Sequence, residues 1–146
     1  MIEHFDGVIG IIFQKTTPVK YALIYNKNTK NVTFPAGGKE TEENSSLQTL
    51  ERELKEETGL QPTDYNIIKT NIVHEFVYGS NKKERAGQIA KQIVYLIETT
   101  KTTLIPEDPD SVFDGWYTSK GVNRKLTFSD SKELFEKARK YMLCKY

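Results

Sequence analysis

Four glutamates stand within seven residues of the segment ERELKEETGL, which runs from Glu51 to Leu60. The last two, Glu56 and Glu57, come just before Gly59, where a helix is expected to end. A helix C-terminus carries partial negative charge and favours lysine or arginine, by about 0.3–1 kcal/mol per charge. Carboxylates at this place are therefore unfavourable within the helix itself, whereas a divalent cation would make them favourable.

The carboxylates of Glu53, Glu56 and Glu57 are predicted to project from one edge of this helix. At 100° per residue, Glu57 lies about 40° to one side of Glu53 and Glu56 about 60° to the other. Like charges at i,i+4 spacing cost roughly 0.2–0.5 kcal/mol. The apolar side of the helix is expected to face the core through Leu47, Leu50 and Leu54. The carboxylates should then lie at the rim of the core.

A solvated charged helix is the alternative interpretation of the same residues. Glu51 with Lys55, and Arg52 with Glu56, stand at i,i+4 spacing and would make such a face tolerable. Only the wider pattern around the helix can separate the two interpretations.

Hydrophobic patterning predicts the elements that must position this edge. Strands are expected at residues 8–13, 21–25, 32–34, 66–78 and 92–98, with a last short strand opening at Trp116 and Tyr117. Turns or loops are expected at residues 26–31, 36–38, 79–91 and 99–115.

Two helices are expected between and after these strands. Ser45 or Ser46 should cap the first helix, with Gln48 three residues after Ser45. Asp130 should cap a C-terminal helix whose apolar stripe is Leu134, Ala138 and Tyr141 or Met142. The resulting order, β-β-helix-β-β-helix, predicts an α+β fold, an α/β/α sandwich with a mixed β-sheet between helices.

Bulk composition limits the class of protein. A chain of 146 residues is expected to form one domain, residues 1–146. Its net charge of +1 favours neither a nucleic-acid nor a membrane partner. One cysteine, Cys144, allows no internal disulfide, and the start MIEHFDG lacks a basic leader, so a cytoplasmic location is expected. With only His4 and His74, oxygen ligands must carry any metal chemistry.

The spacing around the glutamates resembles that of the Nudix hydrolases. Gly38, Arg52-Glu53-Leu54, Glu56-Glu57 and Gly59-Leu60 stand in the register of the Nudix box, after a Phe-Pro-x-Gly-Gly lead-in. One position departs, because Asn44 stands where the pattern has its first glutamate. The adjacent Glu43 could substitute if the loop is shifted by one residue.

This resemblance implies a Nudix fold and the hydrolysis of a pyrophosphate bond in a nucleoside diphosphate derivative. It implies Mg²⁺ as cofactor, with Mn²⁺ as a substitute, held by Glu53, Glu56 and Glu57 together with Gly37. It further implies that Glu53, Arg52 and Glu57 are catalytic, with Arg52 orienting Glu53 as a candidate base. In some members the base lies on a later loop, and here the candidates are Glu107, Asp108 and Asp110.

Gly37 and Gly38 would let backbone amides approach the phosphates of a substrate. The layout of the chain resembles that of the asymmetrical diadenosine tetraphosphate hydrolase branch of the family. The features that carry this resemblance are a tyrosine before a basic loop, a lysine-bearing strand, and Trp116 followed by a helix. The expected substrate-binding residues are Gly38, Tyr78, Lys83 and Lys91. The plainer interpretations are a half-buried strand aromatic for Tyr78, core packing for Trp116, and a solvated loop for Lys82 and Lys83.

Other functions are compatible with the same Nudix-box residues. A nucleoside triphosphate pyrophosphatase that removes damaged nucleotides would need the same metal-binding helix. An RNA 5′-end pyrophosphohydrolase is less favoured without an extended basic surface. A non-catalytic Nudix-fold nucleotide-binding module would be signalled by loss of the glutamates, which are present. The expected partner is a small nucleotide, and a monomer or a homodimer is expected.

Overall fold

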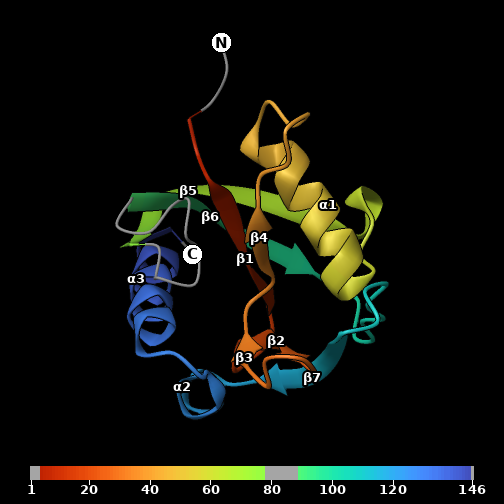
Figure 1. The fold of residues 1–146 in the computed structure, drawn as a ribbon. Coiled ribbons are helices and arrows are strands. Elements are labelled where there is room, and N and C mark those ends of the chain that lie inside the picture. The colour runs from red at the N-terminus through yellow and green to blue at the C-terminus, as the bar shows by residue number, and fades with distance from the viewer. Residues whose placement is uncertain (1–3, 78–88, 146) are drawn as a thin grey trace.

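A computed structural model describes residues 4–77 and 89–145. Within them, a seven-stranded mixed sheet lies between helix α1 (Ser46–Thr58) and helix α3 (Ser129–Lys145), as Figure 1 shows. The central strand β1 (Gly7–Gln14) runs parallel to β6 (Ile89–Thr99) and antiparallel to β2 (Lys20–Asn26). The predicted α+β sandwich with a mixed sheet is therefore confirmed.

The remaining elements extend this sheet or connect to it. Strand β5 (Tyr65–Val77) pairs with β6 at one edge, after a short 3₁₀ turn, η1 (Pro62–Asp64). Strand β4 (Ala36–Gly38) pairs with β1. Strands β3 (Val32–Thr33) and β7 (Ser111–Tyr117) both pair with β2, and helix α2 (Ser119–Lys125) follows β7.

Several boundaries differ from the prediction. Residues 36–38, expected as a loop, form β4, and part of the expected loop 99–115 belongs to β7. Helix α2 was not predicted, and Asp130 lies in the first turn of α3 instead of at its cap. The three-residue β4 is held by pairing with β1, and β7 by pairing with β2, and short-range periodicity does not report such pairing.

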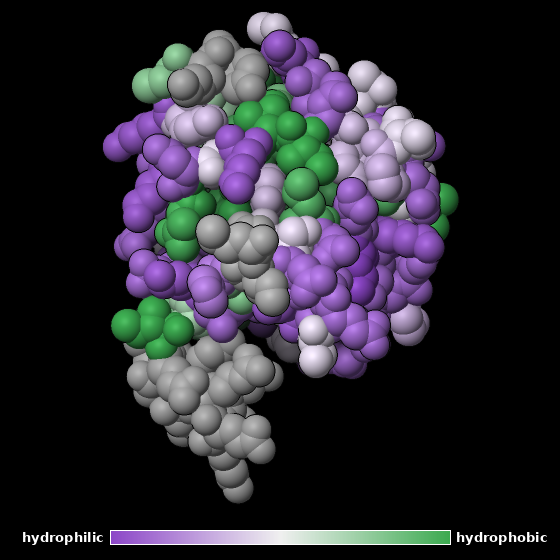
Figure 2. Space-filling model, turned by 90° about the horizontal axis from the view of Figure 1, so that it is seen from above, coloured by the Kyte–Doolittle hydropathy of each residue, from purple (hydrophilic) through white to green (hydrophobic). Residues whose placement is uncertain are grey.

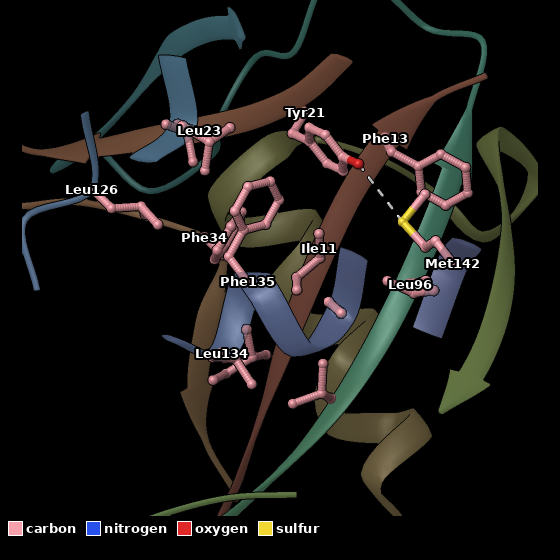
Figure 3. Close-up of a cluster of buried hydrophobic side chains, with 14 residues drawn as sticks. Ile11, Phe13, Tyr21, Leu23, Phe34, Leu96, Leu126, Leu134, Phe135 and Met142 are labelled. Carbon is pink, nitrogen blue, oxygen red and sulfur yellow. Dashed lines mark hydrogen bonds between the residues drawn. The ribbon is translucent and has the colours of Figure 1, made fainter. Parts of the chain in front are cut away.

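Hydrophobic residues pack on both faces of the sheet, and β1 divides them by alternation. Val8 and Ile12 point toward α1, while Ile9, Ile11 and Phe13 point toward α3. Figure 3 shows the hydrophobic cluster on the α3 side of the sheet, where residues of α3 pack against the strands. Its aromatic side chains include an edge-on pair, with ring centroids 4.8 Å apart, formed by Tyr21 and Phe135.

The ends of α1 follow the predicted signals. Ser45 caps the helix in a reciprocal capping box with Gln48, and Gly59 ends it in the left-handed conformation at φ 75°. Leu50 and Leu54 are buried as expected, but Leu47 is 44% exposed, so its assignment to the core was wrong. Ser46 is buried in its stead, and its hydroxyl lies 2.6 Å from that of Tyr95.

Hydrophilic residues cover much of the face seen from above, with smaller hydrophobic patches between them (Figure 2). Among the described residues, no helix combines the length and the apolar character needed to cross a lipid bilayer.

Candidate active site

Two glutamates of α1 meet the backbone of β4. The Glu53 side chain is buried, at 8% exposure, and its carboxylate lies where a Cβ on Gly37 would be. A carboxylate oxygen of Glu57 accepts a hydrogen bond of 2.8 Å from the Ala36 amide. Glu56, in contrast, keeps 45% of its side chain exposed. The helix therefore presents two carboxylates to β4 and a third to solvent beside them.

Arg52 links this edge to the loop that precedes α1. Its Nη1 donates to Glu53 at 2.8 Å and its Nη2 donates to the Gly38 carbonyl at 2.6 Å. Its Nε donates to Glu43 at 2.9 Å. The guanidinium group thus fixes the Glu53 carboxylate and the end of β4 at once.

Glu43 fills the place that Asn44 leaves. Its carboxylate binds Arg52, and it also accepts hydrogen bonds from the Thr49 hydroxyl and the Glu40 amide, each at 2.8 Å. Asn44 is exposed and contributes its backbone amide to Gln48. Glu43 therefore supplies the carboxylate that binds Arg52, and the Asn44 side chain does not.

Replacing Glu43 by glutamine is expected to lower the free energy of unfolding by about 1–3 kcal/mol, because charged hydrogen bonds to Arg52 are lost. Arg52 lowers the pKa of Glu43 to about 2, so this contribution is present above about pH 4.5 and is lost as pH falls toward 2. Urea denaturation at pH 7 and pH 3 measures it. Asn44→Ala is the matched control and should change stability by less than about 0.5 kcal/mol. An equal effect of both substitutions would contradict the assignment.

The carboxylates facing β4 hold their protons unusually tightly. Burial raises the pKa of Glu53 to about 7, against the opposing effect of Arg52. Burial also raises the pKa of Glu57 to about 8, with further contributions from the charges of Glu53 and Asp108. Such shifts mark carboxylates placed near one another in a poorly solvated site.

The acidic loop before β7 lies at the same end of α1. The amides of Glu107 and Asp108 donate to the Glu56 carbonyl at 2.9 and 2.8 Å, and the Ile105 amide donates to the Thr58 carbonyl at 3.0 Å. These bonds satisfy carbonyls that the helix end leaves open. The loop that the sequence offered as an alternative source of a base is thus attached beside Glu57.

The chemistry of this donor set suits a hard divalent cation, since it consists of carboxylate and carbonyl oxygens. Gly37 leaves the space that the Glu53 carboxylate occupies, and Glu57 is surrounded by like charge that a cation would neutralise. Over residues 4–77 and 89–145, no three acidic, histidine or cysteine side chains are already gathered at one point.

A cavity of about 480 Å³ lies on the other face of β4, beneath the start of α3. Aromatic and apolar side chains line most of it, and Gln92, Asp130 and Ser131 supply polar groups. Its size is that of pockets for small molecules. Ala36 lines this cavity and its amide donates to Glu57, so β4 contacts both the cavity and a carboxylate of α1.

Of the expected substrate-binding residues, Gly38 and Lys91 belong to the described part of the chain. Lys91 is exposed on β6, where its amide donates to the Asp6 carboxylate at 2.7 Å. Tyr78 and Lys83, like Lys82 and Arg85, lie outside the described residues. The indole of Trp116 packs on the core beside α1 and donates to the Thr102 carbonyl at 2.8 Å, in keeping with the core interpretation.

Sequence reasoning missed the residues of the cavity. His74 and Gln92 are cross-strand neighbours of β5 and β6, and Phe76 lies two residues along the same face. Strand alternation could have placed His74 and Phe76 together. Nothing in the pattern indicated that Phe128, just before α3, and Asp130, in its first turn, would line the cavity.

The chain is similar to known proteins in both sequence and fold. The family model described as NUDIX domain matches residues 4–138. A comparison of the sequence with functionally curated proteins gave no match.

Three solved structures illustrate the fold shared with this chain. The NUDIX domain of Shewanella oneidensis NrtR, complexed with ADP ribose, has a TM-score of 0.74 at 17% identity, covering 97% of this chain and 90% of that one. The E. coli dihydroneopterin triphosphate pyrophosphohydrolase has a TM-score of 0.72 at 12% identity, with coverages of 92% and 97%. The C. elegans Ap4A hydrolase has a TM-score of 0.70 at 15% identity, with coverages of 95% and 99%. At these identities the likeness concerns the fold.

Proposed function

The chain belongs to the Nudix domain family of pyrophosphohydrolases, and we propose from this premise that its substrate is a dinucleoside polyphosphate such as diadenosine tetraphosphate. The observation that carries the proposal is the meeting of Glu53 and Glu57 with β4, directly beside a partly apolar cavity. The carboxylates can hold a cation that binds the phosphates of a substrate, and the cavity can accommodate its nucleoside. The C. elegans Ap4A hydrolase shares this fold.

The residues of α1 fit a Mg²⁺ ion, with Mn²⁺ as a substitute, held by Glu53, Glu56 and Glu57 together with Gly37. When bound, the ion would neutralise phosphate charge and lower the pKa of bound water. Arg52 orients the Glu53 carboxylate, and the Ala36 amide orients that of Glu57. Gly37 and Gly38 allow a substrate to approach the backbone of β4 closely.

A base must accept a proton from the attacking water. Glu53 is one candidate, because it is buried and held by Arg52. The loop carrying Glu107, Asp108 and Asp110 is the other, because it is attached to the end of α1 and Asp108 affects the pKa of Glu57. Comparing Glu53→Gln with Asp108→Asn in single-turnover assays separates the two.

Cationic groups are needed to hold a chain of four phosphates. Lys91 lies on β6 beside Asp6, whose carbonyl accepts a hydrogen bond from the Lys39 amide immediately after β4. This arrangement supports a role for Lys91 in substrate binding. Lys83 and Tyr78 remain assigned on the sequence resemblance alone.

The test is a panel of dinucleoside polyphosphates, nucleoside triphosphates and nucleotide sugars, assayed with Mg²⁺ and with product identification. Diadenosine tetraphosphate is expected to be turned over fastest. Faster turnover of a nucleoside triphosphate would favour the alternative, a nucleotide-pool pyrophosphatase, and overturn the proposed substrate. The same reactions in ¹⁸O-enriched water identify the phosphorus that is attacked. Binding without hydrolysis of any compound would indicate a nucleotide-binding module.

A further inference from the structure

A wall of three side chains separates the cavity beside β4 from a second one. The second cavity, of about 330 Å³, lies against the outer part of β5 and the second turn of α3. Both cavities are lined by the same three residues, His74, Asp130 and Leu134. These three side chains therefore stand between the two cavities.

His74 is the fixed part of this wall. Its Nδ1 lies 3.0 Å from the side-chain oxygen of Gln92 on β6, and its Nε2 lies 3.4 Å from the Asp130 carboxylate on α3. Its ring stacks on Phe76, with centroids 5.9 Å apart and planes inclined by 30°. Contacts to two strands and a helix hold the imidazole in one orientation.

The first cavity offers what a flat heterocycle needs. The aromatic side chains of Phe76 and Phe128 line it, and the Gln92 amide and the Asp130 carboxylate provide polar edges. The second cavity differs, because Glu75, Glu133 and Lys137 give it a charged lining. A base in the first cavity would thus meet His74 on the side that faces the second cavity.

We propose that His74, braced by Asp130, sets the size of the nucleobase that this site accepts. The inference rests on the proposed function, because it takes the cavity beside β4 to hold the base of a nucleotide substrate. With His74 in place, a purine fits but a purine carrying a large substituent meets the imidazole. Without it, the substituent enters the second cavity.

The test measures nucleotide binding by calorimetry in EDTA, so that it does not depend on hydrolysis. The probes are AMP and two analogues that enlarge different edges of the base, N6-benzyl-AMP and 8-benzylamino-AMP. Wild-type protein is expected to bind AMP at least about tenfold more tightly than either analogue. His74→Ala is expected to bind at least one analogue at least tenfold more tightly than wild type does.

Two further variants make the result specific. His74→Phe keeps the bulk of the wall without its polar atoms and should still exclude both analogues. Glu133→Gln changes only the second cavity and should bind AMP and both analogues as wild type does. Thermal unfolding shows whether each variant is folded. If His74→Ala is not, Asp130→Ala opens the same wall from α3 and takes its place in the test.

The inference is overturned if the open-wall variant binds both analogues no better than wild type, or if wild type binds them as tightly as AMP. It is also overturned if wild type binds none of the three. Hydrolysis of diadenosine tetraphosphate is assayed on the same proteins. A change in size selectivity without any hydrolysis would contradict the proposed function and leave the role of His74 standing.

Discussion

Glutamine in place of Glu57 is expected to lower kcat at least about a hundredfold, because it removes a charged ligand and with it transition-state stabilisation borne by the metal. Glu56→Gln should have an effect of the same order. Steady-state kinetics at saturating Mg²⁺ measures both variants. Glu51→Gln, an exposed position on the same helix, is the matched control and should keep wild-type kcat. Full activity in both Glu56→Gln and Glu57→Gln would exclude the metal assignment.

Glu57→Gln should also make the metal-free protein more stable at pH 8, by about 1–3 kcal/mol. The reason is that a neutral amide of the same shape replaces a partly buried charge. The pKa values of Glu53 and Glu57 are raised in the folded protein, to about 7 and about 8. The folded state therefore binds more protons than the unfolded state between about pH 4.5 and pH 8. Stability of the metal-free wild type should fall as pH rises through this window.

Melting temperatures in EDTA between pH 5 and pH 8 test this expectation. The decline with pH should be smaller in Glu57→Gln, and Mg²⁺ should oppose it in the wild type by binding the folded state. A wild-type melting temperature that rises steadily from pH 5 to pH 8 without metal would show that these carboxylates are not held protonated. Loss of activity together with a gain in stability would place Glu57 in the functional site.

Alanine at position 37 is expected to reduce Mg²⁺ affinity and activity by at least about tenfold. The new Cβ would overlap the Glu53 carboxylate, which is buried and held by Arg52 and so cannot move aside freely. Moving one ligand of a metal site changes its geometry and its charge. Calorimetric titration with Mn²⁺ and steady-state kinetics measure the two effects.

Gly38→Ala is the matched control for metal affinity. A Cβ at that position would meet its nearest neighbour, the Asp6 carbonyl oxygen, at 3.7 Å, which is an ordinary contact. Its Mn²⁺ affinity should therefore stay within about threefold of wild type. Equal loss of affinity in both variants would indicate that β4 as a whole is disturbed and that contact with Glu53 is not the cause.

Local patterns of the sequence were enough for much of the fold. Runs of β-branched and aromatic residues predicted β1 and β2, and Ser45, Gln48 and Gly59 predicted both ends of α1, because strand propensity and helix capping depend on residues close in the chain. The same local information failed for β4, which exists through its pairing with β1. It also failed for Leu47, because whether that face of α1 is buried depends on which other elements pack against the helix.

The sequence by itself predicted the candidate cation ligands Glu53, Glu56 and Glu57, because the 100° period of the helix places them on one edge. Only the tertiary structure decided that the Glu43 carboxylate binds Arg52, since this contact depends on how the loop before α1 folds against the helix. Only the tertiary structure brought His74 to Asp130, which are 56 positions apart in the chain (130 minus 74). Their contact requires α3 to pack across the sheet, and that packing is a property of the whole core.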